Sequence, residues 1–487
     1  MPPTVPNFIA EPARSTPIAW EGDVVVVGGS CTGVFAAIRA ARLGMSVALV
    51  EQNVIFGGSA TAAQVNEWHS LYDTSGHTPI IGGLTREVVE SMRQRGATAE
   101  SPNGLRDPFR FNSAELAATL DELVTRHNIR PFLSARVVAG SRLDDRIEAV
   151  VLEDKSGRRA LKARVFIDAS GDGDLLRRCG FSAWRAEALQ PVTLQALVGG
   201  LATLRETYPE ADFWKDACDS ASSYGLPPIN AKPWISPFPG APGISNLYGP
   251  RMGGVDASDA DQHTAAILQG RSYIRAYLAM ARDRYPEAVF NVVAWSQALG
   301  VRETWHAKCH SRITGNSLLA GKPYEDAIAF GTYPIDIHHE GGTTLRWLDG
   351  TEQHIDPNGN SSRGRWRDAV DTPGYYAVPY RSLVPERAEN LLVAGRLIDA
   401  DRDAFGAVRV MVNTNQTGEA VGVAAALAVR DGRPVAGVDP TKLRNTLADG
   451  GSILPPPPAS ISKTPAVSIG SKPQSTPRMS GSSASSD

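Results

Sequence analysis

Two short apolar runs near the start of the chain predict a strand–helix–strand unit. Val24–Val27 is an unbroken run of valines, which is typical of a strand buried on both faces, and Val47–Val50 is a second run of this kind. Between them, residues 34–43 carry small and apolar side chains at helical spacing. The pattern therefore predicts a parallel βαβ unit over residues 23–51.

The turn after the first strand matches a dinucleotide-binding fingerprint. Gly28 permits a tight turn, Gly33 lets the helix pack closely on the strand, and Glu51 follows about 20 residues later, where an acid accepts hydrogen bonds from a ribose. Backbone N–H groups at the start of the helix then face a pyrophosphate. Ser30 stands where the commonest fingerprint has its middle glycine. The unit alone permits NAD, NADP or FAD.

Periodicity further along predicts a helix over residues 114–127 and then a small β-meander. Its strands are expected at residues 135–138, 146–153 and 163–168, and the last of these runs into a turn of small residues that suits close passage beside a nucleotide. A second small-residue turn spans residues 56–61. Asp172 and Asp174 do not predict a calcium site, because the other ligands of an EF-hand loop do not follow them.

The amino-acid composition changes between residues 181 and 379, where many of the tryptophans and histidines lie. A helix over residues 261–284 and a β-ribbon at residues 233–249 are expected there. Strands return at residues 375–379 and 390–396. They are followed by a helix of small residues over 421–430, with Thr417 and Gly418 at its start, and such a helix N-terminus favours a negative or carbonyl group.

Composition excludes several classes of protein. A net charge of −3 and a pI near 6.3 give no broad attraction to nucleic acid or anionic membrane, and the four cysteines show neither a CxxC pair nor metal-ligand spacing. No apolar run is long enough to span a membrane, and the first twenty residues lack a signal-peptide core. The default expectation is a cytoplasmic protein without a metal site. The Pro/Ser-rich end of the chain is expected to be disordered.

Taken together, these motifs resemble the FAD-dependent oxidoreductase family within the glutathione-reductase-like flavoproteins. The resemblance rests on residues 23–33 with Glu51, and on residues 57–61, 167–174, 300–304, 376–381, 390–396 and 406–422. It implies an α/β fold: a Rossmann-like, three-layer FAD-binding domain with a β-meander and an inserted α+β substrate or cap domain. The expected organisation is an irregular lead-in (1–20), a first FAD-binding segment (21–180), the substrate or cap domain (181–378), a second FAD-binding segment (379–445) and a disordered tail (446–487).

The same resemblance implies a set of residues that contact FAD. They are Gly28, Gly29, Ser30, Cys31, Thr32 and Gly33 at the pyrophosphate, Glu51 and Gln52 at the ribose, Gly57, Gly58 and Thr61 near the flavin, Val137 at the adenine, Ala169, Ser170 and Gly171 beside the nucleotide, Gly395 and Arg396 in the phosphate cradle, and Gln416, Thr417 and Gly418 at the flavin helix.

Candidates for catalysis come from the middle and end of the chain. Arg302 can clamp an anionic substrate or pair with Glu303, and Arg409 lies beside the expected flavin helix. His338 has a side chain suited to proton transfer, and its neighbour His339 is expected on the opposite face of a strand. His306 and Tyr380 are further candidates. His69 can approach or anchor the flavin, or serve as an ordinary structural histidine.

The expected activity is that of a dehydrogenase or oxidase in which a small organic substrate gives a hydride to flavin N5. There is no second glycine fingerprint and no dithiol, so a nicotinamide-driven disulfide reductase is not expected. Two alternatives remain: a flavin-dependent tRNA-modifying protein, which predicts a basic surface, and an electron-transfer subunit that needs a partner. The substrate, the electron acceptor, covalent attachment of FAD and a homo-oligomer are left open.

Overall fold

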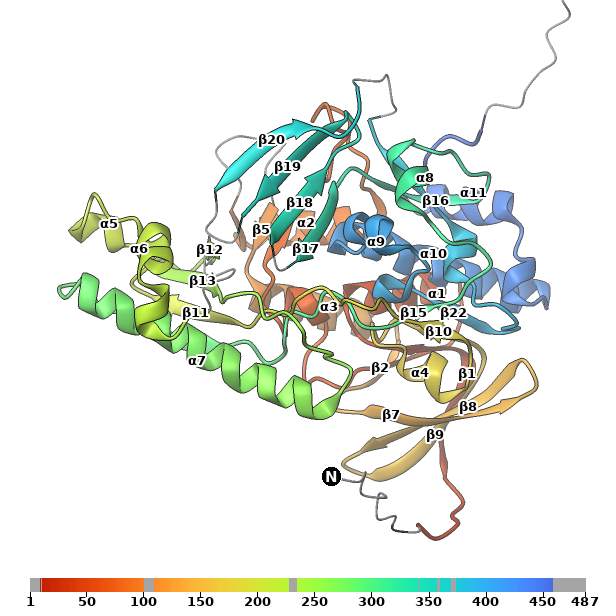
Figure 1. Ribbon diagram of the computed structural model, residues 1–487. Helices are drawn as coiled ribbons and strands as arrows, with labels where there is room; N and C mark the ends of the chain where they lie inside the picture. Colours follow the sequence, from red (N-terminus) through yellow and green to blue (C-terminus); the bar gives the residue numbers. More distant parts are fainter. Residues whose placement is uncertain are drawn as a thin grey trace, which may run out of the picture. The chain divides into compact units, whose positions relative to one another are not determined.

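The computed structural model describes residues 9, 11–99, 109–226, 234–339, 341–356, 360–368 and 374–458. Contacts between residues group Met1–Pro457 into one compact unit and Pro458–Asp487 into another. The helices and strands below belong to the first unit (Figure 1).

A parallel sheet lies at the centre of this unit, with neighbouring strands in the order β6–β2–β1–β9–β22. The strands are β1 (Ile18–Val27), β2 (Val47–Val50), β6 (Arg130–Phe132), β9 (Gly157–Asp168) and β22 (Leu391–Val393). Because the strands are parallel, their carboxyl ends meet at one edge, where α/β sheets bind their ligands. The predicted βαβ unit is confirmed. Its first strand begins at Ile18, within the expected lead-in, because Ile18 pairs with Ala160 of β9.

The sheet is covered on both faces, which makes three layers. Val24 and Val26 of β1 face a core shared with helices α1 (Cys31–Arg42), α2 (Gly83–Gln94), α3 (Ser113–Arg126) and α10 (Met411–Asp431). Val25 and Val27 face the β-meander, made of β7 (Arg136–Leu143), β8 (Arg146–Asp154) and the first half of β9, together with α4 (Asp174–Arg178). The valine run is therefore buried on both sides, as its composition predicts.

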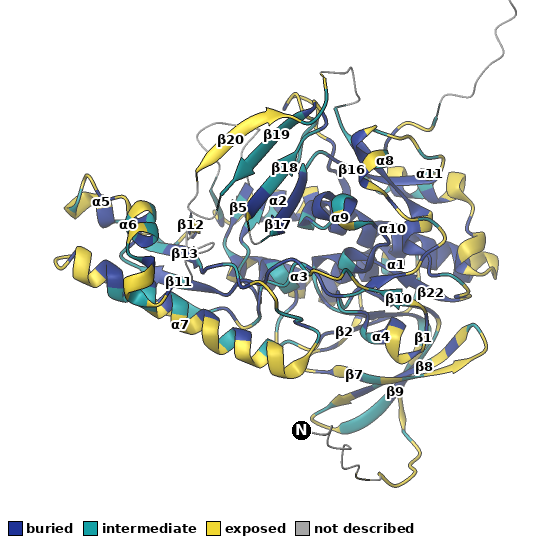
Figure 2. Ribbon diagram, viewed as in Figure 1, coloured by how far each residue is buried: buried dark blue, intermediate teal, exposed yellow. Residues whose placement is uncertain are grey.

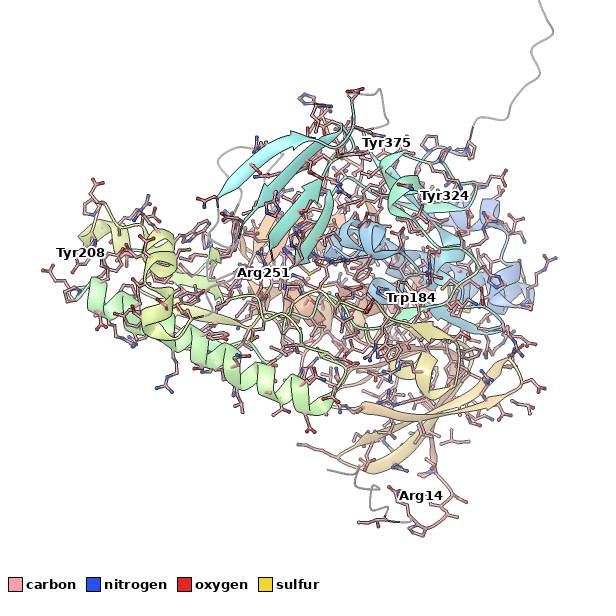
Figure 3. The ribbon with its side chains drawn as sticks, in the orientation of Figure 1. Arg14, Trp184, Tyr208, Arg251, Tyr324 and Tyr375 are labelled. Carbon is pink, nitrogen blue, oxygen red and sulfur yellow. The ribbon has the colours of Figure 1, made fainter. Side chains whose placement is uncertain are left out.

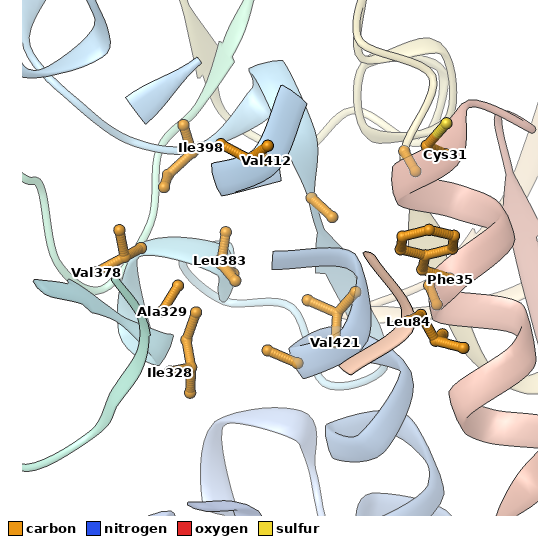
Figure 4. Packing of buried hydrophobic residues seen from close by; sticks show 14 of the residues in the cluster. Cys31, Phe35, Leu84, Ile328, Ala329, Val378, Leu383, Ile398, Val412 and Val421 are labelled. Carbon is orange, nitrogen blue, oxygen red and sulfur yellow. The ribbon is translucent and has the colours of Figure 1, made fainter. Parts of the chain in front are cut away.

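Helices α1 and α10 cross at very close range. An added Cβ at Gly418 would lie 2.1 Å from the carbonyl oxygen of Thr32, and one at Gly422 would lie 2.2 Å from that of Ala36. Figure 4 shows Phe35 of α1 and Val421 of α10 in the core beside this crossing. The helix expected over 421–430 is thus longer than predicted, because α10 starts at Met411. Gly418 serves helix packing.

The expected insert carries two further antiparallel sheets. The first has the order β12–β13–β11–β14 and packs on α6 and α7; the second has the order β17–β18–β19–β20, and α9 packs against β17. Their elements are β11 (Gln195–Gly199), α5 (Leu204–Thr207), α6 (Phe213–Asp219), β12 (Trp234–Pro237), β13 (Ile244–Tyr248), α7 (Ala260–Arg284), β14 (Asn291–Trp295), β17 (Ile335–His339), β18 (Gly342–Arg346), β19 (Thr351–Ile355), β20 (Ser361–Arg365) and α9 (Arg402–Val408). The helix and the ribbon expected here are confirmed.

Short ladders complete the unit. They comprise β3 (Glu67–Trp68), β4 (Thr98–Ala99) and β5 (Phe109–Phe111), then β10 (Ala183–Trp184) with β15 (His306–Ala307), and β16 (Ala327–Gly331) with β21 (Tyr376–Pro379), alongside α8 (Gly315–Leu319) and α11 (Pro440–Asp449). Figure 2 shows α1 and α10 almost wholly buried, whereas β20 and the outer face of α7 are exposed. Within the described residues, no helix has the length and apolar character needed to cross a membrane.

The expected tail begins too early at residue 446. Helix α11 continues to Asp449, the Gly451 carbonyl accepts a hydrogen bond from the Gly83 N–H, and Ser452 Oγ accepts one from Arg39. Ile453 and Leu454 pack against the core. These contacts fix the chain as far as Leu454, whereas residues 459–487 lie outside the described residues.

Candidate functional site

One cavity of about 750 Å³ runs along the carboxyl edge of the parallel sheet and beneath the two antiparallel sheets. The volume is within the usual range for a site that binds a cofactor or small molecule. At one end its lining is made of glycines and other small residues of the βαβ unit, and at the other end it is made of charged and aromatic side chains.

Backbone lines the first end, which we call the glycine cradle: Gly28, Ser30, Cys31, Thr32, Gly57, Gly58, Ala169, Ser170, Gly171 and Gly395. The two small-residue turns predicted from sequence lie side by side, since Ser30 and Gly57 form a parallel bridge and the Gly57 N–H donates to the Gly29 carbonyl at 2.8 Å. An added Cβ at Gly28 would lie 2.4 Å from the Ala169 carbonyl oxygen, and Gly28 has φ of +98°. The cradle therefore excludes side chains from the space beside the sheet.

Glu51 and Arg396 are the charged groups of the cradle. The Glu51 carboxylate accepts hydrogen bonds from the Gly29 N–H at 2.6 Å and the Asn53 N–H at 2.8 Å, while burial raises its pKa. Arg396 donates to Asp172 at 3.0 Å, and Gln52 also lines this end. These groups supply an acceptor for sugar hydroxyls and a cation near the strand end.

Helix α10 brings its N-terminus to the cavity. Val410, Met411, Val412, Thr414 and Asn415 line it, whereas the predicted Gln416, Thr417 and Gly418 do not. Gln416 instead bonds the backbone of Phe330, and Thr417 Oγ1 accepts from the Gly395 N–H at 3.1 Å. The sequence prediction is shifted by about two turns, because it takes the small residues as the helix start when they are its packed middle.

Four other residues expected at the cofactor also lie behind the lining. Gly29 and Gly33 support the turn: an added Cβ at Gly33 would lie 1.8 Å from the Gly28 carbonyl oxygen. Thr61 Oγ1 donates to the Phe56 carbonyl and closes the second turn. Val137 is buried in the meander core. These four residues support the turns and the core next to the cavity, and their direct contact with the cofactor stays a prediction.

Asp336 lies at the centre of the second end, which we call the arginine cluster: His69, Arg251, Arg302, Tyr333, Asp336, His338, Thr343 and Arg409. The Asp336 Oδ2 atom accepts from Arg409 at 2.8 Å and from the Tyr333 hydroxyl at 3.0 Å, and it lies 3.3 Å from His338 Nε2. Although burial opposes ionisation, His338, Arg409 and Arg251 hold the pKa of Asp336 well below its ordinary value. Asp336 is thus a carboxylate.

Arg251 and Arg302 join the cluster from two other segments. Arg302 donates to the Pro191 carbonyl at 2.7 Å and to Thr193 Oγ1 at 2.8 Å, while Arg251 lies 3.4 Å from Thr343 Oγ1. Figure 3 shows Arg251 between the sheet that contains β13 and strands β17 and β18. Burial lowers the pKa of Arg302, and repulsion from Arg251 and Arg409 lowers it further. The cluster therefore concentrates positive charge.

Two histidines at this end are neutral. Burial, opposed by Asp336 but reinforced by Arg251 and Arg302, lowers the pKa of His338, whose Nδ1 is 2.8 Å from Thr343 Oγ1. Burial also lowers the pKa of His69, whose ring packs against Tyr333 at 4.5 Å between ring centres, with the two rings tilted by 30°. His339 lies on the opposite face of β17, where it stacks with His354, as strand geometry predicts.

The structure places His306 and Tyr380 away from the cavity. His306 is buried between Trp184 and Phe405, and its ring nitrogens face Glu303 and the Ile398 carbonyl. The Tyr380 hydroxyl donates to the Val435 carbonyl at 2.8 Å. Residue type and neighbouring motifs favour a catalytic role for both residues. In the structure, however, both side chains are buried and form hydrogen bonds within the core.

His306 nevertheless connects to the arginine cluster through a chain of hydrogen bonds. Glu303 accepts from the Gln190 N–H at 3.0 Å, and the Gln190 side chain bonds the Asp336 carbonyl and the His338 N–H of β17. Arg302 therefore faces the cavity, while the neighbouring Glu303 and His306 support the strand that carries Asp336.

Comparison with known families identifies the cofactor of this chain. The model of the family described as "FAD dependent oxidoreductase" matches residues 23–447. The chain belongs to this family. The family contains FAD-dependent enzymes, so FAD is the cofactor of this chain. The residues present fit that group, because glycines and other small residues line the cradle and leave room for a ligand beside the backbone, and an acidic residue and an arginine also line it.

Individual relatives are more distant. A ferredoxin–NADP reductase of Saccharopolyspora erythraea is 37% identical over 82 residues, which cover 17% of this chain and 24% of that protein. Among solved structures, a p-nitrophenol 4-monooxygenase of Pseudomonas putida has 11% identity and a TM-score of 0.43, covering 88% of this chain and 84% of its own. A flavoprotein/dehydrogenase of Cytophaga hutchinsonii has 13% identity and a TM-score of 0.42, with 88% and 82% covered.

Sequence reasoning missed Arg251, Asp336, Tyr333 and Thr343. Asp336 had a usable signal, since residues two apart on a strand share a face and His338 is a candidate from sequence. The sequence gives no signal for Arg251, because this residue follows β13 in a segment that contains no recognisable motif. Its place in the cluster comes from the packing of the two antiparallel sheets.

Proposed function

We propose that this FAD-dependent enzyme oxidises a small organic substrate, which binds at the arginine cluster and gives up a hydride to flavin N5. The observation that supports the proposal is the continuity of the cavity: the glycine cradle and the arginine cluster line one space. A cofactor held in the cradle and a substrate held in the cluster would share that space. Bound FAD supplies a two-electron acceptor for hydride.

The residues of the cradle would hold the cofactor. In this proposal the backbone of Gly28–Thr32 and Arg396 bind its pyrophosphate, Glu51 accepts hydrogen bonds from its ribose, and the N-terminus of α10 faces the flavin. The helix dipole favours negative charge at that point, and reduction increases the negative charge of a flavin.

The arginine cluster would orient the substrate and manage its proton. In this proposal a substrate C–H bond would break with loss of hydride, for which bound FAD would supply the acceptor. An adjacent O–H, N–H or C–H bond of the substrate would release its proton to a base while its electron pair forms the new double bond. His69 has a lowered pKa, lines the cavity and packs at a tilt against Tyr333, with Nδ1 at 3.2 Å from Ser70 Oγ. We propose it as the acceptor of that proton, because both ring nitrogens of His338 already face partners, Asp336 and Thr343.

Anaerobic reduction tests the proposed function. Purified enzyme is mixed with panels of alcohols, hydroxy acids, amines and saturated acids, and the visible absorbance of the flavin is followed. Bleaching by one class supports hydride transfer from that class. Full retention of the absorbance with every donor, while dithionite still bleaches the flavin, would refute the proposal. A His69→Gln variant should bleach more slowly with the same donor.

A further inference from the structure

Only some of the charged side chains that line the cavity form ion pairs. Glu67 pairs with Arg110 at 2.8 Å, Asp172 pairs with Arg396 at 3.0 Å, and Asp336 pairs with Arg409 at 2.8 Å. Among the described residues, Arg251 and Arg302 form no ion pair. Their hydrogen bonds go to neutral groups, and both interact at longer range with the Asp336 carboxylate, which already pairs with Arg409, so three guanidinium groups share one carboxylate at this end of the cavity.

Unmet hydrogen bonds accompany this excess charge. Arg409 Nε, a buried donor, has no hydrogen-bond partner, and neither does Trp68 Nε1. Both residues line the cavity. A buried donor left without a partner costs about 1–3 kcal/mol, and isolated buried charge costs more, so such groups are usually satisfied by a ligand. The excess positive charge and the two unmet donors favour an anion with several acceptor oxygens. In the described part of the chain, three buried acceptors without a partner also line the cavity, Gln195 Oε1, Asp336 Oδ1 and Asn415 Oδ1, and a hydroxyl or other neutral donor on the same anion would satisfy them.

We propose that the substrate is a carboxylic acid without a cationic group, and that Arg251 and Arg302 bind its carboxylate. This inference rests on the proposed function, since it names the class of molecule that the arginine cluster takes. A planar carboxylate matches the fork of a guanidinium and can accept two hydrogen bonds from it. Repulsion from three arginines disfavours amines and amino acids. At this end of the cavity their ammonium group would face three guanidinium groups and the Asp336 carboxylate, whose Oδ2 already accepts from Arg409 and Tyr333 and whose Oδ1 has no partner among the described residues.

Binding of simple acids to the FAD-loaded enzyme tests this inference without turnover. Acetate, malonate and benzoate are compared with acetamide, malonamide and benzamide, which keep the shape but lose the charge. Binding is measured by calorimetry and by the change in the visible spectrum of the flavin. We expect at least one acid to bind and its amide to bind about tenfold to a hundredfold more weakly, as expected for charge-assisted hydrogen bonds.

Variants identify the residues responsible. Arg251→Met and Arg302→Met should each weaken binding of the acid about tenfold or more, and Arg302→Lys, which keeps the charge but not the fork, should weaken it less. Arg363→Met is the matched control, because Arg363 is exposed on β20 and its replacement removes the same charge outside the cavity. Thermal unfolding of each variant shows whether it is folded.

Three results would overturn the inference: amides that bind as tightly as their acids, folded Arg251 and Arg302 variants that bind acids as wild type does, or no binding by any acid. These outcomes are distinct from failure of the proposed function. Acids that bind through Arg251 and Arg302 in an enzyme whose flavin no donor bleaches would support the anion site and refute hydride transfer. Bleaching by neutral alcohols alone would support hydride transfer and refute the anion site.

Discussion

The two ends of the cavity are built in opposite ways. The glycine cradle is lined by backbone from short, local motifs, and an added methyl group at Gly28 would overlap the chain. The arginine cluster is built from the charged side chains of Arg251, Arg302, Asp336 and Arg409, which lie far apart in sequence. The cradle therefore depends on the absence of side chains, and the cluster depends on the balance of their charges.

The largest effect should come from removing the negative charge of the cluster. Asp336→Asn leaves three arginines without their carboxylate, and breaking a buried ion pair costs about 3–5 kcal/mol. Urea denaturation should show this loss. Glu352→Gln is the control, since it breaks the more exposed Arg346–Glu352 pair and should cost no more than about 1 kcal/mol. Equal losses in the two variants would contradict the distinction between a charge-balanced cluster and ordinary surface pairs.

A methyl group in the cradle should come next. Gly33→Ala places its Cβ 1.8 Å from the Gly28 carbonyl oxygen, where both partners are backbone, so the strand–turn–helix must shift. Overpacking of this kind costs about 3 kcal/mol at the upper end, and the ratio of flavin to protein absorbance should fall in the purified variant. Gly364→Ala, at an exposed site with open space, should change neither property.

The neutral state of His338 predicts a pH dependence. Its folded-state pKa is lowered, so below pH about 6.5 the unfolded chain binds a proton that the folded chain does not. Stability should therefore fall as the pH drops below about 6.5, by at most about 1.4 kcal/mol per pH unit from this group.

Thermal unfolding between pH 7 and pH 5 (roughly the window of histidine titration) checks this prediction. In His338→Gln this contribution to the slope should disappear. The exposed His310→Gln serves as the control and should retain the wild-type slope. An unchanged slope in His338→Gln would show that burial beside the arginines does not keep this imidazole neutral.

The smallest effect should come from restoring the usual glycine of the fingerprint. Ser30 has φ of −60° and its side chain makes no capping hydrogen bond, so the position does not require glycine and gains little from serine. Ser30→Gly should change the free energy of unfolding by only a few tenths of a kcal/mol, and flavin content should be retained. A large loss of bound FAD in this variant would show that the serine side chain itself contributes to the cradle.

Much of the cradle could be predicted from sequence because its information is local. The run Val24–Val27, the turn that begins at Gly28 and the acid at Glu51 each carry a backbone requirement within a few residues, and the structure puts them where the pattern predicts. Helix α10 was harder to predict. Its glycines allow the close crossing with α1. Without knowledge of that partner helix, the same glycines suggest the start of a helix.

The sequence by itself determined the βαβ unit and the family, because strand period and glycine turns follow from short-range patterns. Only the tertiary structure decided which charged residues meet. It placed Arg302, Arg409 and His338 at the cavity, added Arg251 and Asp336, and removed His306 and Tyr380 to the core. The reason is that these charged residues come together only when segments distant in sequence pack against each other, and no local sequence pattern predicts that packing.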